Sequence, residues 1–257
     1  MEKIISIHIP KTAGTSFRKT LEHVYGRSML SLYNYGSDQL APFQEKVPDK
    51  IKLIHGHINL NQYHALIEKN PEWKDALFIT WVRNPVDRFI SNYYYMNQLI
   101  TDQMKLFPRR PGLQKRMLRS LDEVANQENE HDLLSRYISP KFLAENKYLF
   151  IGETEHYSND LARLATLLNW AKYPLYQVNR TANKKDVDER IKRKIAAGSK
   201  KDLTLYKEII SWNNDQKKNS DQLSPKAPEQ IIQESKRSLK RSIKIAIRSI
   251  VGRFTGI

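Results

Sequence analysis

The stretch SIHIPKTAGTSF, residues 6–17, decides the fold that we expect for the whole chain. Before it, the short β-branched run from Lys3 to Ile7 predicts a buried strand, because it is too short for a helix and shows no helical period. Pro10 ends this strand, since proline has no N–H and a fixed φ. Gly14 then permits a tight or left-handed turn before an amphipathic helix over 17–25.

This order of strand, loop of small residues and helix predicts a site for a phosphate or sulfate. Thr15 and Ser16 are good N-caps, and the free N–H groups of the first helical turn meet the positive end of the helix dipole. Lys11, Thr12, Thr15 and Ser16 can add side-chain donors. The alternative is an ordinary turn with a surface lysine. The stretch is not a Walker A motif, because Lys11 precedes Gly14 instead of following the glycines.

The composition indicates one globular domain with an anionic partner. The chain has 257 residues, 40% of them hydrophobic, which is enough to bury a sizeable core. Its net charge of +15 at pH 7 favours nucleotides, acidic polysaccharides, nucleic acid or an anionic membrane surface, and charge alone does not choose among them. The absence of cysteine excludes disulfides and thiolate metal sites.

The N-terminus shows no targeting signal. The chain enters a strand at once, with no charged region, long apolar region or cleavage site. No apolar run approaches the length that spans a bilayer. We therefore expect a cytoplasmic protein.

A second strand is predicted over 51–54, and it ends at His55, Gly56 and His57. Open α/β sheets hold their ligands at such strand ends, and on a strand residues 55 and 57 share one side. The pair suits a general base with a helper, a metal site or plain packing, and the anion loop favours catalysis. The histidines that could approach in space as a third metal ligand are His8, His64 and His131.

A third strand is predicted over 76–82, followed by Arg83 and by a helix that begins near Pro85. Arg83 then leaves the sheet at the same edge as the first loop, where Ser91 can face the same ligand. Arginine suits bidentate contact with a second phosphate. Two phosphate sites predict a nucleotide phosphorylated at both ends of its ribose. A salt bridge between Arg83 and Asp87 is the alternative.

The remaining elements follow from apolar periodicity and from Gly and Pro positions. Helices are expected at 113–128, 133–138, 159–168, 188–197 and 201–213, a strand at 148–151, and loops at 28–50, 106–112 and 177–185. The loop at 28–50 has room for one short helix. The loop at 177–185 is polar and basic, and it either closes over a nucleotide or is a solvated connection.

The expected fold is α/β, with a P-loop-like central parallel sheet flanked by helices over residues 1–213. Residues 214–228 are polar with two prolines, which indicates a linker. Residues 229–257 predict a basic amphipathic C-terminal helix. Such a helix either contacts an anionic membrane surface or docks on the domain by its apolar stripe.

The motifs HIPKTAGTSF, HGH, VRNPVDRFISNYYYM and FIGETE occur in this order. Together they resemble the sulfotransferases that use 3′-phosphoadenosine 5′-phosphosulfate (PAPS), in particular the Golgi carbohydrate group that contains the uronosyl 2-O-sulfotransferases. The resemblance covers roughly residues 3–212. It implies transfer of a sulfuryl group from PAPS to an acceptor hydroxyl, expected on a carbohydrate, with adenosine 3′,5′-bisphosphate (PAP) as product.

The resemblance also implies roles for individual residues. His57 matches the histidine that acts as base in the 2-O-sulfotransferases, and His55 is its neighbour in HGH. Arg83 and Ser91 would hold the 3′-phosphate. The residues that would hold the 5′-phosphosulfate are Lys11, Thr12, Ala13, Gly14, Thr15 and Ser16. The residues of a later cofactor loop, matched only loosely, are Asn179, Arg180, Thr181 and Lys184.

Two features depart from the Golgi members, because this chain has neither an N-terminal anchor nor cysteine. A soluble, bacterial relative is therefore expected. The basic segment 229–257 is not part of the family pattern, so peripheral contact with an anionic membrane through it is an expectation from its charge alone.

The expected reaction is an in-line displacement that requires no metal. His57 would take the proton of the acceptor hydroxyl, and Lys11 would stabilise the leaving oxygen. One rival is a P-loop-type kinase, which should need Mg²⁺ and a lysine after the glycines. The other is a non-enzymatic basic protein on nucleic acid or membrane, which leaves the two phosphate motifs unexplained. For the sulfotransferase, no nucleic-acid partner is expected.

Overall fold

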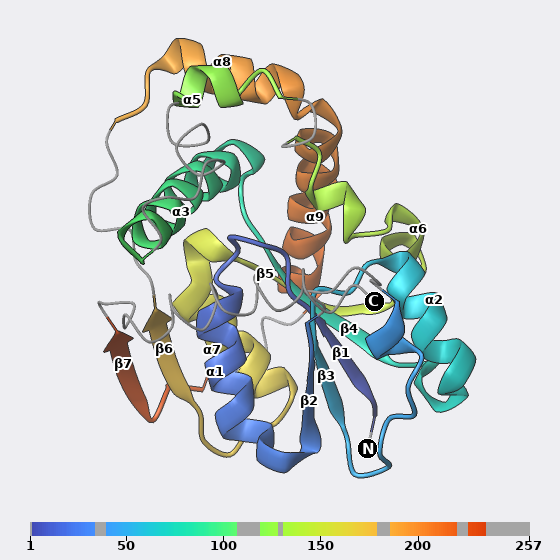
Figure 1. The fold of residues 1–257 in the computed structure, drawn as a ribbon. Coiled ribbons are helices and arrows are strands. Elements are labelled where there is room, and N and C mark those ends of the chain that lie inside the picture. Colours follow the sequence, from blue (N-terminus) through green and yellow to red (C-terminus); the bar gives the residue numbers. More distant parts are fainter. Residues whose placement is uncertain are drawn as a thin grey trace.

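The computed structural model describes residues 2–33, 40–106, 119–127, 131–178, 186–219 and 226–234. Its centre is a five-stranded parallel sheet with the strand order β2-β3-β1-β4-β5 (Figure 1). The strands are β1 (Ile4–Ile7), β2 (Met29–Leu32), β3 (Leu53–Gly56), β4 (Leu77–Val82) and β5 (Tyr148–Glu153). The predicted α/β class with a central parallel sheet is confirmed.

Helices cover both faces of the sheet (Figure 1). The helices are α1 (Gly14–Tyr25), α2 (Leu60–Lys69), α3 (Pro85–Leu106), α5 (Leu121–Val124), α6 (Pro140–Ala144), α7 (Tyr157–Leu167), α8 (Glu189–Gly198) and α9 (Lys200–Asn219). Short 3₁₀ turns lie at Gly26–Ser28, Ala41–Phe43, Pro71–Trp73, Leu134–Arg136 and Thr154–His156. Among the helices that the structure describes, none combines the length and the apolar character needed to cross a membrane.

The strands are apolar on both sides because each side is packed under helices. On one face, Phe17 of α1 and Leu161 of α7 share a buried cluster with Ile79 of β4. On the other face, Leu66 of α2 and Ile209 of α9 pack with alternate strand residues. This alternation follows from the two-residue period of a strand. It explains why the strands appear in the sequence as continuous apolar runs.

A second, two-stranded parallel sheet lies beside α1 and consists of β6 (Pro174–Val178) and β7 (Gln230–Glu234) (Figure 1). Two hydrogen bonds fasten β6 to α1. The hydroxyl of Thr20 donates to the carbonyl of Pro174 at 2.9 Å, and the N–H of Val178 donates to the hydroxyl of Ser16 at 3.0 Å. These two bonds hold β6 along α1, and the bond to Ser16 places Val178 at the first turn of this helix.

The predicted boundaries of the C-terminal part need correction. Helix α9 runs to Asn219, so the linker expected over 214–228 does not begin at 214. Residues 214–219 are polar but contain no proline, and they continue the helix. Residues 230–234 form strand β7, not the start of the helix expected over 229–257, because they pair with β6. Residues 235–257 lie outside the described part of the chain.

Three further predictions of local structure are wrong. Residues 29–32 were expected in a loop and form β2, which pairs with β3. Residues 177 and 178 were expected in a polar loop and belong to β6. The helix expected over 113–128 is, within 119–127, only the short α5, which begins after its N-cap Ser120. In each case a pairing or a cap that is not visible as periodicity decides the outcome.

Candidate active site

The loop between β1 and α1 has a strained backbone. Lys11 has φ 74° and Ala13 has φ 61°, a left-handed conformation that is uncommon for residues other than glycine. Ala13 is the N-cap of α1, and no side chain in the described part of the chain caps this end. Strain of this kind gathers at functional sites. The N–H groups of the first turn are thus left for an anion.

The predicted capping by Thr15 and Ser16 is wrong. Helix α1 begins at Gly14, so both residues lie within its first turn. The hydroxyl of Ser16 accepts the N–H of Val178 instead. The hydroxyl of Thr12 is buried and donates a hydrogen bond of 2.9 Å to the carbonyl of Ile9, within the same loop. These two hydroxyls therefore hold the loop and the first turn of α1 in place.

Gly14 brings the loop against a histidine. A Cβ placed on Gly14 would lie 1.8 Å from Cδ2 and 2.0 Å from Nε2 of His8. No side chain fits at position 14 while the His8 ring keeps its place. The ring of His8 therefore lies directly on Gly14, the first residue of α1 and part of the predicted anion site.

Lys11 connects this loop to α3. Its Nζ lies 4.0 Å from the centre of the Tyr95 ring, which is a cation–π contact. Tyr95 lies four residues after Ser91 on α3, so the two share one face of that helix. The structure thus brings the predicted 5′ site and the predicted 3′ site to the same edge of the sheet.

Arg83 directly follows β4, which neighbours β1 in the sheet. Its side chain is 13% exposed, and its Nε makes no hydrogen bond within the described residues. The nearest carboxylate is Glu155, whose Oε1 lies 4.0 Å from that Nε. The alternative salt bridge to Asp87 is not present in the described part of the chain. A partly buried arginine whose buried Nε has, among the described residues, only a 4.0 Å contact to a carboxylate fits an anionic ligand.

Three histidines form one stack at the ends of β1 and β3. The His8 ring lies parallel to the His55 ring at 5.5 Å (17°) and to the His57 ring at 4.6 Å (21°). His131 lies elsewhere, hydrogen-bonded to Ser199 and to the carbonyl of Ala125. Within the described ranges, no group of three or more histidines and carboxylates could hold a metal ion.

The hydrogen bond of His57 fixes its tautomer. Its Nδ1 lies 2.6 Å from the carbonyl oxygen of His8, and a carbonyl only accepts, so Nδ1 carries the proton. Nε2 then has a free lone pair. Burial lowers the pKa of His57, although the bond to His8 opposes this. A neutral, half-buried imidazole with an open nitrogen can accept a proton from a ligand.

His55 has a different position from the one predicted. It is 0% exposed and lies within β3, where its Nδ1 is 2.8 Å from the hydroxyl of Ser6. Burial lowers its pKa to about 3, assisted by the charge of Arg18. The structure thus gives His55 a buried position between Ser6 and the His8 ring, and its catalytic role stays a prediction. Gly56 permits the strand pairing beside it, since a Cβ there would lie 1.8 Å from the carbonyl oxygen of Leu32.

Two residues of this site were missed by the sequence reasoning. His8 was considered only as a metal ligand, yet its ring separates His55 from His57. Tyr33 follows β2, its hydroxyl lies 2.7 Å from His8 Nδ1, and its ring meets the His57 ring edge-on at 4.9 Å. Burial, and then the neighbouring His55 and His57, hold the pKa of His8 well below its ordinary value. The position of His8 at the start of the motif HIPKTAGTSF could have indicated that it belongs to the site. Tyr33 lies in no motif, so nothing in the sequence indicated its place.

The residues of the expected later cofactor loop lie outside the described part of the chain. They are Asn179, Arg180, Thr181 and Lys184. In the sequence they follow Val178, the last residue of β6, which is bonded to Ser16.

A family model described as "Sulfotransferase family" matches residues 1–234. A similar solved structure is mouse sulfotransferase SULT7A1 complexed with PAP, with 16% sequence identity and a TM-score of 0.37. That match covers 76% of this chain and 62% of the mouse chain, less than two thirds of it. No curated protein sequence matches significantly.

Proposed function

Because the chain belongs to the sulfotransferase family, we propose that it transfers a sulfuryl group from PAPS to the hydroxyl group of an acceptor, leaving PAP. The single observation that carries this proposal is the arrangement at the ends of β1, β3 and β4. Lys11 and Arg83 follow two neighbouring parallel strands, and His57, with its proton on Nδ1, follows the third.

The chain offers a fitting donor set for PAPS. The uncapped first turn of α1 provides N–H groups for the 5′-phosphosulfate, and Lys11 adds a positive charge beside it. Arg83 has a buried Nε without a hydrogen bond among the described residues, which suits the 3′-phosphate. Ser91 lies on the face of α3 that also presents Tyr95 to Lys11. PAPS supplies an electrophilic sulfuryl group to this site.

His57 is the proposed base. Its Nε2 accepts the proton of the acceptor hydroxyl as the oxygen of that hydroxyl bonds to sulfur, and the bond from sulfur to the phosphate oxygen breaks. Lys11 then stabilises the negative charge that grows on this phosphate oxygen. The lowered pKa of His57 keeps its nitrogen unprotonated near neutral pH. The scheme rests on alignment and charge stabilisation by the residues of the chain.

An acidic carbohydrate is the proposed acceptor class. The Tyr137 ring lies 6.3 Å from the His57 ring, and Arg136 and Arg88 are close enough to Tyr137 to oppose the rise of its pKa caused by burial. Arg88 is buried, whereas Arg136 is exposed, so Arg136 is the positive charge near the base that favours a carboxylate-bearing acceptor. The overall charge of +15 acts in the same direction.

The experiment is transfer of label from ³⁵S-PAPS to a panel of acceptors, without added metal. The panel pairs carboxylated polysaccharides with neutral ones and includes glycolipids and tyrosine peptides. We expect label on a carboxylated polysaccharide, and a Lys11→Ala variant should lose it. Label on another class would overturn the acceptor assignment. No label on any acceptor, with phosphate transfer from ATP and Mg²⁺ instead, would overturn the proposed reaction.

A further inference from the structure

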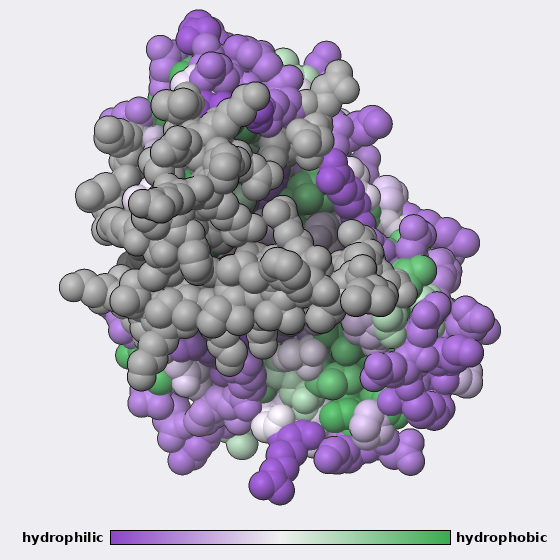
Figure 2. All heavy atoms as spheres, in the orientation of Figure 1, coloured by the Kyte–Doolittle hydropathy of each residue, from purple (hydrophilic) through white to green (hydrophobic). Residues whose placement is uncertain are grey.

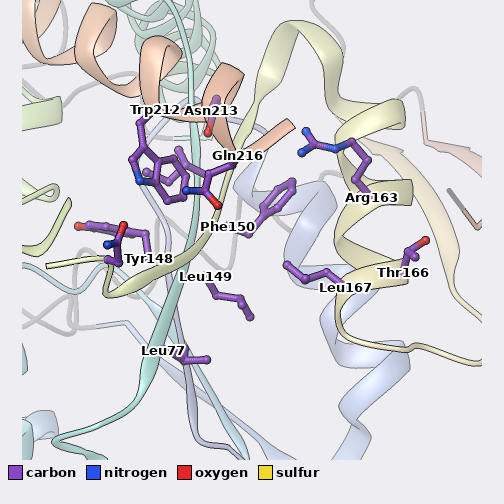
Figure 3. A pocket seen from close by; sticks show the side chains of 12 residues that line it. Leu77, Tyr148, Leu149, Phe150, Arg163, Thr166, Leu167, Trp212, Asn213 and Gln216 are labelled. Carbon is purple, nitrogen blue, oxygen red and sulfur yellow. The ribbon is translucent and has the colours of Figure 1, made fainter. Parts of the chain in front are cut away.

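Polar side chains alone do not single out a further ligand contact, because most of the described surface on the face drawn in Figure 2 is hydrophilic. A cavity of about 400 Å³ beside β5 is lined by parts of β5, α7 and α9 (Figure 3). There the guanidinium of Arg163 contacts Asp160 at 3.4 Å, and the ring nitrogen of Trp212 is buried. A polar group with a clearer position lies at the end of β1, where His8 meets the candidate active site.

The His8 ring contacts both of the parts that the proposed reaction must bring together. Its face is 4.6 Å from the ring of His57, the proposed base. Its edge lies against Gly14, where a Cβ would be 2.0 Å from Nε2 of His8. Gly14 begins α1, whose first turn is proposed to bind the phosphosulfate. An in-line displacement places the sulfuryl group between this phosphate and the hydroxyl on the base, and therefore beside His8.

His8 is a neutral imidazole near pH 7. Burial holds its pKa well below the ordinary value, and neighbouring basic groups add to this effect. These groups are, in order, His55, His57, Arg18 and Lys11. Lys11 and His57, which have proposed roles in the transfer, therefore both lie near His8. A neutral imidazole carries a proton on one of its two nitrogens and donates only from that nitrogen.

The hydroxyl of Tyr33 can set which nitrogen of His8 carries the proton. The hydroxyl oxygen lies 2.7 Å from Nδ1 of His8. When the hydroxyl donates to Nδ1, the proton of His8 is on Nε2, at the edge that lies against Gly14. The opposite tautomer would turn a lone pair of Nε2 toward the bound anion and repel it. His8 is partly exposed, whereas His55 beside it is fully buried, so His8 is the member of this pair that can meet a ligand.

We propose that the Nε2–H of His8 donates a hydrogen bond to a non-bridging oxygen of the sulfuryl group during its transfer, and that Tyr33 positions His8 for this contact. His8 keeps its proton throughout, so the base remains His57. A donor aimed at an oxygen of the transferring group stabilises the charge on it. The inference rests on the proposed sulfuryl transfer. It adds a contact that PAP, which has no sulfuryl group, does not make.

The test compares the rate of a single turnover with the affinity for PAP. The full chain, in excess over ³⁵S-PAPS, is mixed with an acceptor that the panel identifies, and PAP binding is measured by calorimetry. His8→Leu removes the donor, so the transfer should slow about 10²- to 10³-fold, while the dissociation constant of PAP should change by less than about twofold. His8→Gln supplies an amide N–H and should restore roughly tenfold of the lost rate.

Three results with these variants would overturn the proposal. One is a rate near that of the wild type in His8→Leu. Another is an equal loss of rate in His8→Leu and His8→Gln, which would indicate that only the packing of the ring matters. The third is a loss of PAP affinity that matches the loss of rate. If the wild type labels no acceptor, the proposed function fails and this inference fails with it.

Tyr33→Phe covers the case in which His8→Leu does not fold, because it removes only a hydroxyl. It should slow the single turnover about tenfold and convert His8 from the Nε2–H tautomer to a mixture, seen by NMR of ¹⁵N-labelled histidine in the PAP complex. Tyr25→Phe is the matched control, since its hydroxyl bonds to Trp170 at the far end of α1, and it should change neither. A wild-type rate and tautomer in Tyr33→Phe would overturn the role of Tyr33. An Nδ1–H tautomer of His8 in the wild type would overturn the whole proposal, whatever the activity.

Discussion

The Nδ1 of His57 donates a hydrogen bond of 2.6 Å to the carbonyl oxygen of His8. This bond joins the end of β3 to the loop that follows β1. The His8 carbonyl sets which nitrogen of His57 is free, and the His8 ring lies against Gly14 at the start of α1. The proposed base is thus positioned by the same loop that is expected to hold the anion.

Replacing His57 should separate catalysis from binding. His57→Ala removes the nitrogen that accepts the proton, so kcat with an acceptor that the ³⁵S-PAPS assay identifies should fall about 10²- to 10⁴-fold. The dissociation constant of PAP should change little, because His57 is not part of the anion site. His64→Ala, on the exposed side of α2, is the matched control. Turnover near that of the wild type in His57→Ala would contradict the assignment of the base.

Arg83 should distinguish nucleotides by their 3′-phosphate. Loss of a charged hydrogen bond costs about 1.5 to 3 kcal/mol, so Arg83→Ala should weaken PAP binding roughly 10- to 100-fold. Binding of AMP, which lacks the 3′-phosphate, should stay the same. Calorimetry with both nucleotides measures this, and Arg190→Ala, which removes an exposed arginine, controls for total charge. If both nucleotides were weakened equally, the 3′-phosphate assignment would be wrong.

Much of the sheet could be predicted because its strands are short apolar runs closed by Gly or Pro. The run before Pro10 and the run before Arg83 consist mostly of apolar residues, because both faces of these strands are buried. The strands that were missed depend on partners. Met29–Leu32 pairs with β3, and Pro174–Val178 and Gln230–Glu234 pair with each other although they are far apart along the chain. Neither pairing leaves a periodic signal in the sequence.

Some residues of the candidate site could likewise be predicted from motifs, whereas others depend on strand pairing. Lys11, Arg83 and His57 could be predicted because each follows an apolar strand in a recognisable motif. The position of His8 between two other histidines could not, since it depends on the register that sets Ser6 beside His55. Tyr33 depends on a strand that was not predicted. The burial of His55 was missed because β3 extends to Gly56, two residues beyond the expected end.

The contact of Gly14 with His8 should be testable by a rescue. Gly14→Ala places a methyl group where the His8 ring lies, so the variant should be destabilised by about 1 to 3 kcal/mol and bind PAP more weakly. The double variant Gly14→Ala/His8→Ala should recover most of the stability, since the clash is removed. Urea denaturation of both variants and of His8→Ala measures the coupling. Additive losses would show that the two residues do not meet.

The buried His55 should make the protein less stable in acid. Its pKa is lowered from 6.5 to about 3 by burial, so below pH 6.5 the unfolded chain takes up a proton that the folded chain refuses. The stability that this residue contributes is complete above pH 6.5 and is lost as pH falls toward 3. The loss is about 1.4 kcal/mol per pH unit over most of that interval.

The measurement is the free energy of unfolding in urea at pH 7 and at pH 5. The variant Ser6→Ala/His55→Leu lacks both the imidazole and the hydroxyl bonded to it, so its stability should fall less between the two pH values than that of the wild type. Ser6→Ala alone retains the imidazole and should keep most of the wild-type slope. Should the double variant lose as much stability as Ser6→Ala, another group would have to cause the acid sensitivity.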